Sequence, residues 1–138
     1  MAKIIFYEKP GCINGEKQKA ILLRAGHELH CVNILTYHWN KKNLLPFIVG
    51  KTPVSMMNGT APALKTGLID PALLSFEEAM SLMIRDPILI KRPLVKVDDL
   101  CIQGFDDHRL RPYLGSWDEH EDVITCPNLH VISCDAKN

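Results

Sequence analysis

The residues that decide the fold are 3–12, KIIFYEKPGC, within a chain of 138 residues. Positions 3–7 are almost continuously apolar and β-prone, which is typical of a central strand covered on both faces. A helix is predicted from about Ile13 to Ala25, and a second strand over residues 28–34. A strand, a helix and a strand within about thirty residues predict a parallel βαβ unit with a right-handed crossover.

The middle of the chain, residues 39–85, carries a series of helix signals. Asn40 and Thr52 are suited to cap short helices. Ser75 is followed three residues later by Glu78, which is the capping-box pattern, and apolar residues then recur at helical spacing. This part of the chain is therefore predicted to be a helical insertion that is broken into several pieces.

After residue 85 the pattern returns to strands. Residues 88–90 are predicted to begin a strand, and residues 94–97 and 100–102 to form a hairpin. A closing helix is predicted from about Asp106 to Leu114.

These elements together predict an α/β protein of thioredoxin-like fold: a mixed four-stranded sheet flanked by helices, with a helical insertion. The predicted domain spans residues 1–115. Residues 116–138 show little periodicity and are predicted to be a C-terminal tail.

The overall composition is that of a globular protein without a strong charge of either sign. Hydrophobic residues make up 46% of the chain, and 16 basic residues balance 16 acidic ones. A neutral chain has no global field to attract nucleic acid or an anionic membrane, so neither is expected as a partner. No stretch approaches the roughly 20 apolar residues of a membrane span, and no secretory leader is evident. The expected location is the cytoplasm.

The cysteines form an odd set of five spread along the chain, which does not indicate a secreted disulfide framework. In a reducing compartment most of them are expected to be buried small hydrophobic residues. They are Cys12, Cys31, Cys101, Cys126 and Cys134.

Cys12 stands out because it lies between the first predicted strand and the first predicted helix. At a helix start the unpaired N–H groups and the helix dipole favour the thiolate over the thiol. Lys9 and Lys17 add positive charge nearby, whereas Glu8 and Glu16 oppose it. Two interpretations stay open: a reactive thiol, or an inert and partly buried cysteine.

Position 15 is a glycine, so Cys12 has no partner for a C-x-x-C disulfide. Any redox chemistry of Cys12 is therefore expected to be monothiol chemistry. The thiolate would attack an electrophile and would then be released by an external thiol or by a distant cysteine.

The predicted tail contains four residues that bind metals or take part in thiol chemistry: His120, Cys126, His130 and Cys134. They could act as zinc ligands, although standard structural zinc sites use tighter cysteine pairs. Alternatively, Cys126 or Cys134 is a resolving thiol for Cys12.

Three features of the sequence resemble a known family. The opening Ile4–Cys12, the helical insertion and the run DPILIKRPLV at Asp86–Val95 resemble the arsenate reductase and Spx-type (ArsC-like) family of thioredoxin-fold proteins. The resemblance covers about residues 3–115. Within this family, Val49–Pro71 and Asp122–Pro127 look like the nitrogenase-associated branch.

This resemblance implies specific roles for three residues. Cys12 is implied to be the nucleophile, Arg92 to be a ligand of the substrate oxyanion, and Pro93 to follow a cis peptide bond. A planar guanidinium suits a tetrahedral oxyanion. The resemblance also implies glutathione, glutaredoxin or another thiol-redox protein as the thiol partner, with a nitrogenase-system protein as a further partner. No cofactor and no metal are expected.

The sequence departs from the reductases in the arginines that contact arsenate. Two further arginines are implied by the family, but Met56–Thr60 and Leu100–Gly104 contain none. Arg92 alone, with Glu16 nearby, would neutralise an oxyanion poorly. The resulting hypothesis is a monothiol redox or accessory protein linked to nitrogen fixation. The alternative is a glutaredoxin-coupled oxidoreductase of arsenate reductase type that uses Cys12.

Overall fold

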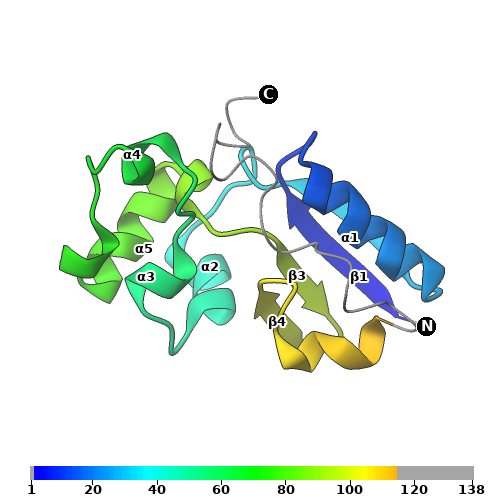
Figure 1. The fold of residues 1–138 in the computed structure, drawn as a ribbon. Helices are drawn as coiled ribbons and strands as arrows, with labels where there is room; N and C mark the ends of the chain where they lie inside the picture. Colours follow the sequence, from blue (N-terminus) through cyan, green and yellow to red (C-terminus); the bar gives the residue numbers. More distant parts are fainter. Residues whose placement is uncertain (1, 115–138) are drawn as a thin grey trace.

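The structure, a computed structural model, describes residues 2–114. Its centre is a mixed four-stranded sheet in the order β2-β1-β3-β4 (Figure 1). The strands are β1 (Lys3–Glu8), β2 (Glu28–Asn33), β3 (Leu94–Val97) and β4 (Leu100–Gln103). Strand β1 runs parallel to β2 and antiparallel to β3, and β3 and β4 form an antiparallel hairpin. The predicted sheet and the inner position of its first strand are confirmed.

One face of the sheet is covered by helix α1 (Ile13–Arg24) and the short 3-10 helix η3 (His108–Tyr113). Because successive side chains of a strand point to opposite faces, Ile4 and Phe6 of β1 both face this layer. They are buried there against Ile21 of α1. The βαβ unit predicted from the opening residues thus forms one of the two cores.

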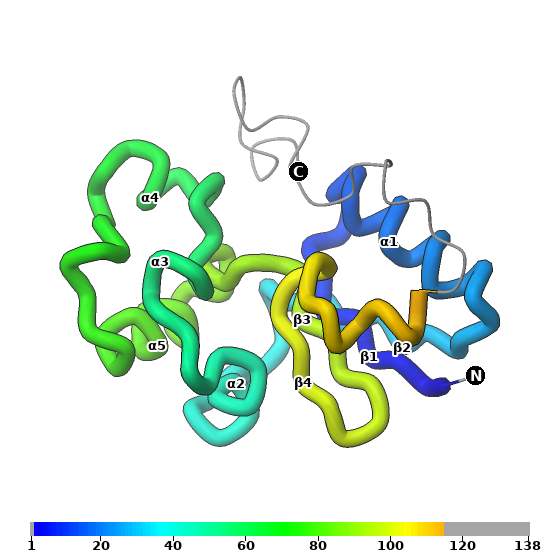
Figure 2. Tube along the Cα trace, turned by 60° about the horizontal axis from the view of Figure 1, so that its bottom comes forward, coloured from blue at the N-terminus to red at the C-terminus, as the bar shows by residue number. Residues whose placement is uncertain are grey.

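The second core lies on the other face, where the predicted helical insertion packs against Tyr7 and Leu94 of the sheet. Figures 1 and 2 show the insertion as a group of helices beside the strands. The predicted caps at Asn40 and Thr52 and the predicted capping box at Ser75 are confirmed, and the first two are capping boxes as well. Within residues 2–114 no helix is long and apolar enough to cross a membrane. The insertion and the turn after it comprise α2 (Lys41–Ile48), α3 (Pro53–Met56), α4 (Pro62–Lys65), η1 (Pro71–Leu73), α5 (Phe76–Arg85) and η2 (Pro87–Leu89).

The prediction that a strand begins at residues 88–90 is wrong. Pro87–Leu89 forms the 3-10 turn η2, and Ile90 makes an isolated antiparallel bridge to Met57 of the insertion. Proline fixes φ near its helical value and is favoured at the first helical position, so Pro87 starts a turn rather than a strand. The apolar residues of this segment are buried by the insertion instead of by a neighbouring strand.

The closing helix differs from its prediction in type and in its first residue. It is the 3-10 helix His108–Tyr113, and it begins after Asp107, whose side chain accepts a hydrogen bond from the backbone N–H of Arg109. Pro112 lies inside it. Because proline has no backbone N–H, it cannot extend an α-helical hydrogen-bond ladder at this point.

The prediction that most cysteines are buried is wrong for the three described ones. Cys31 is exposed, and Cys12 and Cys101 are half-buried. The physical reason for Cys31 is its strand, because β2 is an edge of the sheet and has no fully buried residue. Cys126 and Cys134 lie outside the described residues.

Candidate functional site

The candidate site is at the end of the sheet where β1 finishes. Tyr7 of β1 pairs with Leu94, the first residue of β3. Because these strands are antiparallel, the segment that precedes β3 reaches the sheet beside the end of β1. Arg92 and Pro93 belong to this segment, and the turn that carries Cys12 leaves β1 at the same end. The topology therefore brings together the two parts of the sequence that predicted a site.

Cys12 occupies the N-cap position of α1, which has 12 residues. Its backbone is extended, with φ −74° and ψ 126°, and its N–H donates to the carbonyl of Lys9 at 3.3 Å. Its carbonyl accepts the first helical hydrogen bond, from the N–H of Glu16 at 3.1 Å. At this position the dipole of α1 favours negative charge on the sulfur.

The peptide bond between Arg92 and Pro93 is cis, as the family resemblance implies. Pro93 is buried and Arg92 is half-buried. The Pro93 carbonyl accepts a hydrogen bond from the N–H of Gly104 at 2.9 Å, which ties this segment to the end of β4.

The side chain of Gln103 is a structural element of the site that the sequence did not reveal. It is 3% exposed, and its amide nitrogen donates to the carbonyl of Met56 at 2.9 Å and to that of Lys91 at 3.0 Å. Lys91 N–H in turn donates to the Met56 carbonyl at 3.1 Å. Gln103 therefore fastens the insertion to the residues that precede Arg92. A buried glutamine at a strand end carries no sequence signal of this contact.

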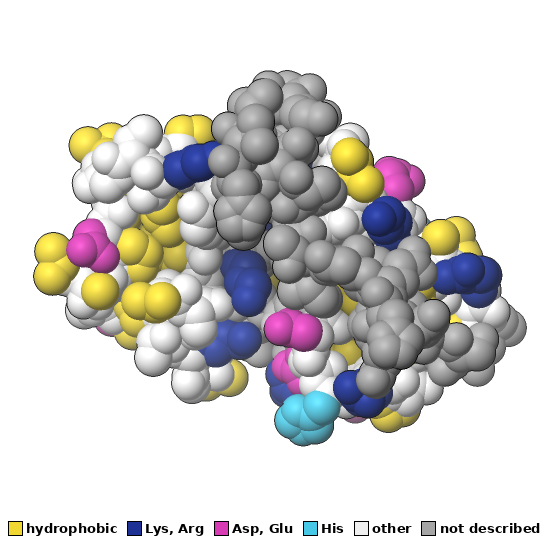
Figure 3. All heavy atoms as spheres, viewed as in Figure 1, with side chains coloured by type: hydrophobic (Ala, Val, Ile, Leu, Met, Phe, Trp, Pro, Cys, Tyr) yellow, Lys and Arg dark blue, Asp and Glu magenta, His cyan; other side chains and the backbone are white. Residues whose placement is uncertain are grey.

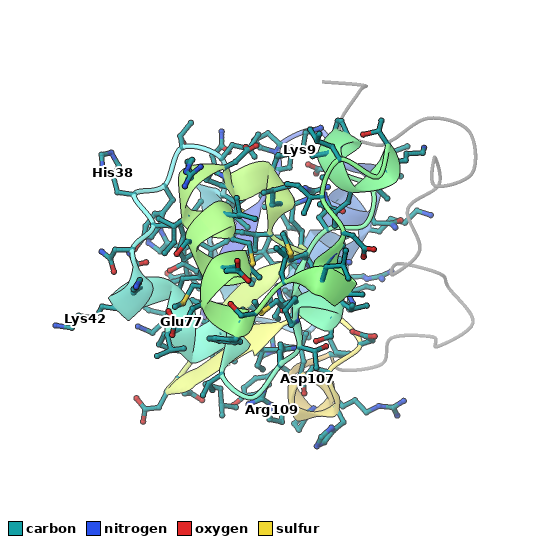
Figure 4. The ribbon with its side chains drawn as sticks, turned by 90° about the vertical axis from the view of Figure 1, so that its left-hand side faces the viewer. Lys9, His38, Lys42, Glu77, Asp107 and Arg109 are labelled. Carbon is teal, nitrogen blue, oxygen red and sulfur yellow. The ribbon has the colours of Figure 1, made fainter. Side chains whose placement is uncertain are left out.

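These contacts place two segments of the chain next to Arg92. The family resemblance implies that each of these segments carries a further arginine. Met56–Thr60 and Leu100–Gly104 contain none. Arg109 does not replace them, since its Nη2 is 2.7 Å from Asp107 Oδ2. Figure 4 shows that Asp107 and Arg109 lie at the opposite end of the molecule from Lys9.

A carboxylate lies buried beneath the Cys12 turn. Glu8 is 7% exposed, and both of its carboxylate oxygens are 3.0 Å from the Lys19 ammonium. Lys19 also contacts Glu16 at 2.9 Å. Although burial lowers the pKa of Lys19, its hydrogen bonds to Glu16 and Glu8 outweigh this and raise that pKa above its ordinary value. Lys19 thus compensates the two acidic residues, a role that the sequence had not assigned to it.

Cys31 of β2 faces the same carboxylate. Partial burial of the sulfur raises the pKa of the Cys31 thiol, and the negative charge of Glu8 and a hydrogen bond to it raise that pKa further. Cys31 is exposed. Its raised pKa favours the protonated thiol, which is less nucleophilic than the thiolate.

Gly15 is in the first turn of α1, at the position of the second cysteine in a C-x-x-C motif. A Cβ atom at this residue would lie 3.7 Å from the Cβ of Cys12. The two Cβ atoms of a disulfide are usually about 3.5–4.5 Å apart. The backbone therefore has the geometry of a dithiol site, while the sequence supplies a single thiol.

On the opposite face of β1, aromatic rings pack at the same end of the sheet. The ring of Tyr7 lies 5.3 Å from those of Tyr37 and Trp39, and 5.5 Å from that of Phe47. Burial raises the pKa of Tyr7 to about 12, with a further contribution from Tyr37. Trp39 donates to the Ile34 carbonyl at 3.0 Å. This cluster holds the insertion against the strand that leads to Cys12.

The predictions for the tail cannot be placed on the structure. The zinc-ligand set His120, Cys126, His130 and Cys134, and the role of Cys126 as a resolving thiol, lie outside the described residues. In the described part of the chain no group of three or more His, Cys, Asp or Glu side chains is arranged to hold a metal.

Solved structures with the same architecture include arsenate reductases and ArsC-related proteins. The arsenate reductase from Vibrio cholerae has a TM-score of 0.66, with 20% identity over 82% of this chain and 98% of that one. A protein related to the ArsC family from Bacteroides fragilis has a TM-score of 0.69, with 22% identity over 80% and 98%. "A possible arsenate reductase" from Streptococcus mutans has a TM-score of 0.60, with 28% identity over 75% and 90%.

The fold of this chain is therefore the thioredoxin-like fold of the ArsC-like structures. No protein-family model matches the chain. It is 36% identical over 129 residues, 93% of its length, to an uncharacterized 15.7 kDa protein from the draG 3' region of Rhodospirillum rubrum, and it covers 90% of that protein. The chain belongs to the family of this 15.7 kDa protein.

Proposed function

We propose that this protein is a monothiol oxidoreductase in which Cys12 is the nucleophile. The observation that carries the proposal is the position of Cys12 at the N-cap of a 12-residue helix, at the end of the sheet where Arg92 and Pro93 lie. A thiolate is the nucleophilic form of cysteine, and a helix N-terminus stabilises it. The glycine at position 15 supports the monothiol character, because no second sulfur is available in the turn.

Arg92 is proposed to bind an anionic group of the substrate. A guanidinium offers paired N–H donors to a carboxylate or an oxyanion. Arg92 precedes the Pro93 carbonyl that is bonded to Gly104, so its backbone is held firmly. We therefore expect Arg92 to orient the electrophile and Cys12 to attack it.

Arsenate is not the substrate that this site favours. Arsenate carries about two negative charges near neutral pH, and an unpaired charge in a partly desolvated pocket costs several kcal/mol. The segments beside Arg92 contain no arginine, and Glu8 adds a buried carboxylate that needs Lys19 to compensate it. A mixed disulfide or another electrophile of low charge fits the site better, with glutathione or glutaredoxin as the reducing thiol.

A role within the nitrogenase system is part of the proposal. It rests on the resemblance of Val49–Pro71 to the nitrogenase-associated branch. The relative encoded in the draG 3' region is a second supporting observation. Deletion of the gene is expected to slow growth on dinitrogen while leaving growth on ammonium unchanged. Equal growth of the deletion strain and its parent on dinitrogen would contradict this role.

A second candidate function, a partner-binding accessory protein, is favoured by the surface of the insertion. Figure 3 shows apolar side chains gathered over this part of the molecule. Val54 is 62% exposed, and Leu68 and Leu73 are each 81% exposed. Large apolar patches exposed on a protein surface mark interaction sites. The two candidates differ in whether Cys12 performs chemistry.

Reduction of hydroxyethyl disulfide by glutathione, in the presence of the full-length protein, distinguishes the candidates. We expect turnover that is lost in Cys12→Ser and kept in Cys31→Ser, which removes the exposed thiol on β2. Arginine at position 92 is tested by Arg92→Lys, which keeps the charge but loses the bidentate geometry. Absence of turnover in the wild-type protein, with Cys12 alkylating no faster than Cys31, would leave the accessory role as the better interpretation.

A further inference from the structure

The space beside Gly15 is bordered by both the candidate nucleophile and a buried carboxylate. A Cβ atom at position 15 would lie 3.6 Å from Glu8 Oε1 and 3.7 Å from the Cys12 Cβ. The same point thus touches the residue that forms the covalent intermediate and a proton acceptor. In a dithiol site this point would carry the Cβ of the second cysteine, next to its sulfur.

Glu8 Oε1 has an acceptor position that no hydrogen bond from residues 2–114 occupies. The residue is more than nine-tenths buried, and the hydrogen bond from Lys19 Nζ goes to the other oxygen, Oε2, at 3.0 Å. Nζ also lies 3.0 Å from Oε1 and neutralises the carboxylate, but Oε1 accepts no hydrogen bond from the described residues. A buried acceptor that accepts no hydrogen bond calls for a specific explanation, even beside an ammonium group.

We propose that a small external thiol attacks the Cys12 sulfur from the Gly15 position, and that Glu8 Oε1 accepts its S–H hydrogen bond and then its proton. This inference rests on the proposed function of Cys12, and it assigns the place where the second substrate enters. Glu8 is then a catalytic base. The attacking group is proposed to be a small thiol rather than a protein cysteine because Gly15 is itself buried.

The step is a thiol–disulfide exchange that balances without any other reagent. Cys12 begins as a mixed disulfide, Cys12–S–S–X. The incoming thiol R–S–H forms a new bond to the Cys12 sulfur, and the bond to the X sulfur breaks with its electron pair leaving on X–S⁻. The proton of R–S–H passes to Glu8, which later returns it to solvent or to X–S⁻. The incoming thiol is oxidised to the disulfide level, and X–S is reduced to a thiolate.

The charged and titratable groups around Glu8 come from two elements besides its own strand. Lys19 contacts it from α1, Glu16 of the same helix shares that ammonium, and Cys31 faces it from β2. Of these, Lys19 is the one that forms an ion pair with the Glu8 carboxylate. Glu16 has a 63% exposed side chain and shares the same ammonium, so it provides a matched control for the loss of one negative charge.

The experiment uses the full chain with Cys31, Cys101, Cys126 and Cys134 replaced by serine. Cys12 is first loaded with Ellman's reagent, and its thionitrobenzoate group is then displaced by 2-mercaptoethanol while the released chromophore is followed. This nitrothiolate is the better leaving group, so the thiol attacks the Cys12 sulfur. We expect Glu8→Gln to slow displacement about tenfold or more, since a positioned base typically contributes at least that much. Glu16→Gln is expected to leave the rate within about twofold.

Two further readouts separate this role from a structural one. Loading of Cys12 is expected to stay equal or to accelerate in Glu8→Gln, because a negative charge near the thiolate is removed; a damaged fold would slow both steps. Gly15→Ala places a methyl group where the thiol would enter and should also slow displacement, while alanine favours the helix. Displacement rates equal to the wild type in both variants would overturn this inference alone. If Cys12 does not load at all, the proposed function fails, and the inference fails with it.

Discussion

The two thiols of Cys12 and Cys31 have surroundings that differ in kind. Cys31 lies on the edge strand β2, is exposed, and has its pKa raised by partial burial and by Glu8. Cys12 is half-buried at the N-cap of α1, where the helix dipole favours negative charge. The accessibility of a cysteine and its expected nucleophilicity therefore do not go together in this molecule. The more exposed sulfur is the one whose surroundings keep it protonated.

The largest expected effect comes from giving Cys12 the partner that it lacks. In Gly15→Cys the two Cβ atoms would start 3.7 Å apart, close to the mean for a disulfide. We expect complete conversion in air to a disulfide between Cys12 and the introduced cysteine, with loss of two hydrogen atoms in the mass spectrum and loss of alkylation at Cys12. Gly59→Cys is the matched control, since a Cβ there meets nothing within 4 Å. A reduced Gly15→Cys protein after oxidation would show that the turn does not have dithiol geometry.

A large difference is also expected between the two native thiols. At pH 7, iodoacetamide should modify Cys12 about tenfold faster than Cys31, because the thiolate is the reacting form. Peptide mass spectrometry after short exposures gives both rates in one sample. Modification of Cys31 first would mean that exposure, not electrostatics, controls reactivity here.

A moderate effect is expected when the Glu8 carboxylate is neutralised. Although burial is the main cause of the raised pKa of Cys31, Glu8 adds to it. Glu8→Gln should therefore lower that pKa, so that more thiolate is present at pH 8 and alkylation of Cys31 rises about threefold. Glu16→Gln should raise the rate less, since Glu16 contributes last to the shift. The pH dependence of alkylation measures both changes, and an unchanged midpoint in Glu8→Gln would contradict the interaction.

The smallest effect on either thiol is expected from a change in the insertion. Ser75 caps α5 through a hydrogen bond from the Glu78 N–H at 3.1 Å. Ser75→Ala should lower the free energy of unfolding by about 1 kcal/mol, as loss of an N-cap usually does. Chemical denaturation measures this, and the alkylation rates of Cys12 and Cys31 should not change. A shift in the Cys12 rate would show that the insertion and the thiol turn are coupled.

Much of the site could be predicted from residues that are close together in the sequence. Three local patterns were enough: a cysteine at a helix start (Cys12), a glycine in place of a second thiol (Gly15), and an arginine directly followed by a proline (Arg92 and Pro93). The contacts of Gln103 with Met56 and Lys91 could not be predicted in this way, because they join residues from three separate segments. Lys19 is a similar case: its spacing from Glu16 was visible, but its contact with Glu8 depends on how α1 packs on β1.

The sequence by itself determined the parallel βαβ opening, the three helix caps of the insertion and the hairpin of β3 and β4. These features follow from periodicity, proline and capping residues, which act over a few neighbouring positions. Tertiary structure decided the rest. The order of the strands left β2 at an edge and so exposed Cys31, and packing of the insertion buried Leu89 and Ile90. Packing of α1 on β1 buried Glu8 beneath the Cys12 turn. The burial and the partners of a side chain depend on which elements become neighbours in space, and that is decided only when the chain folds.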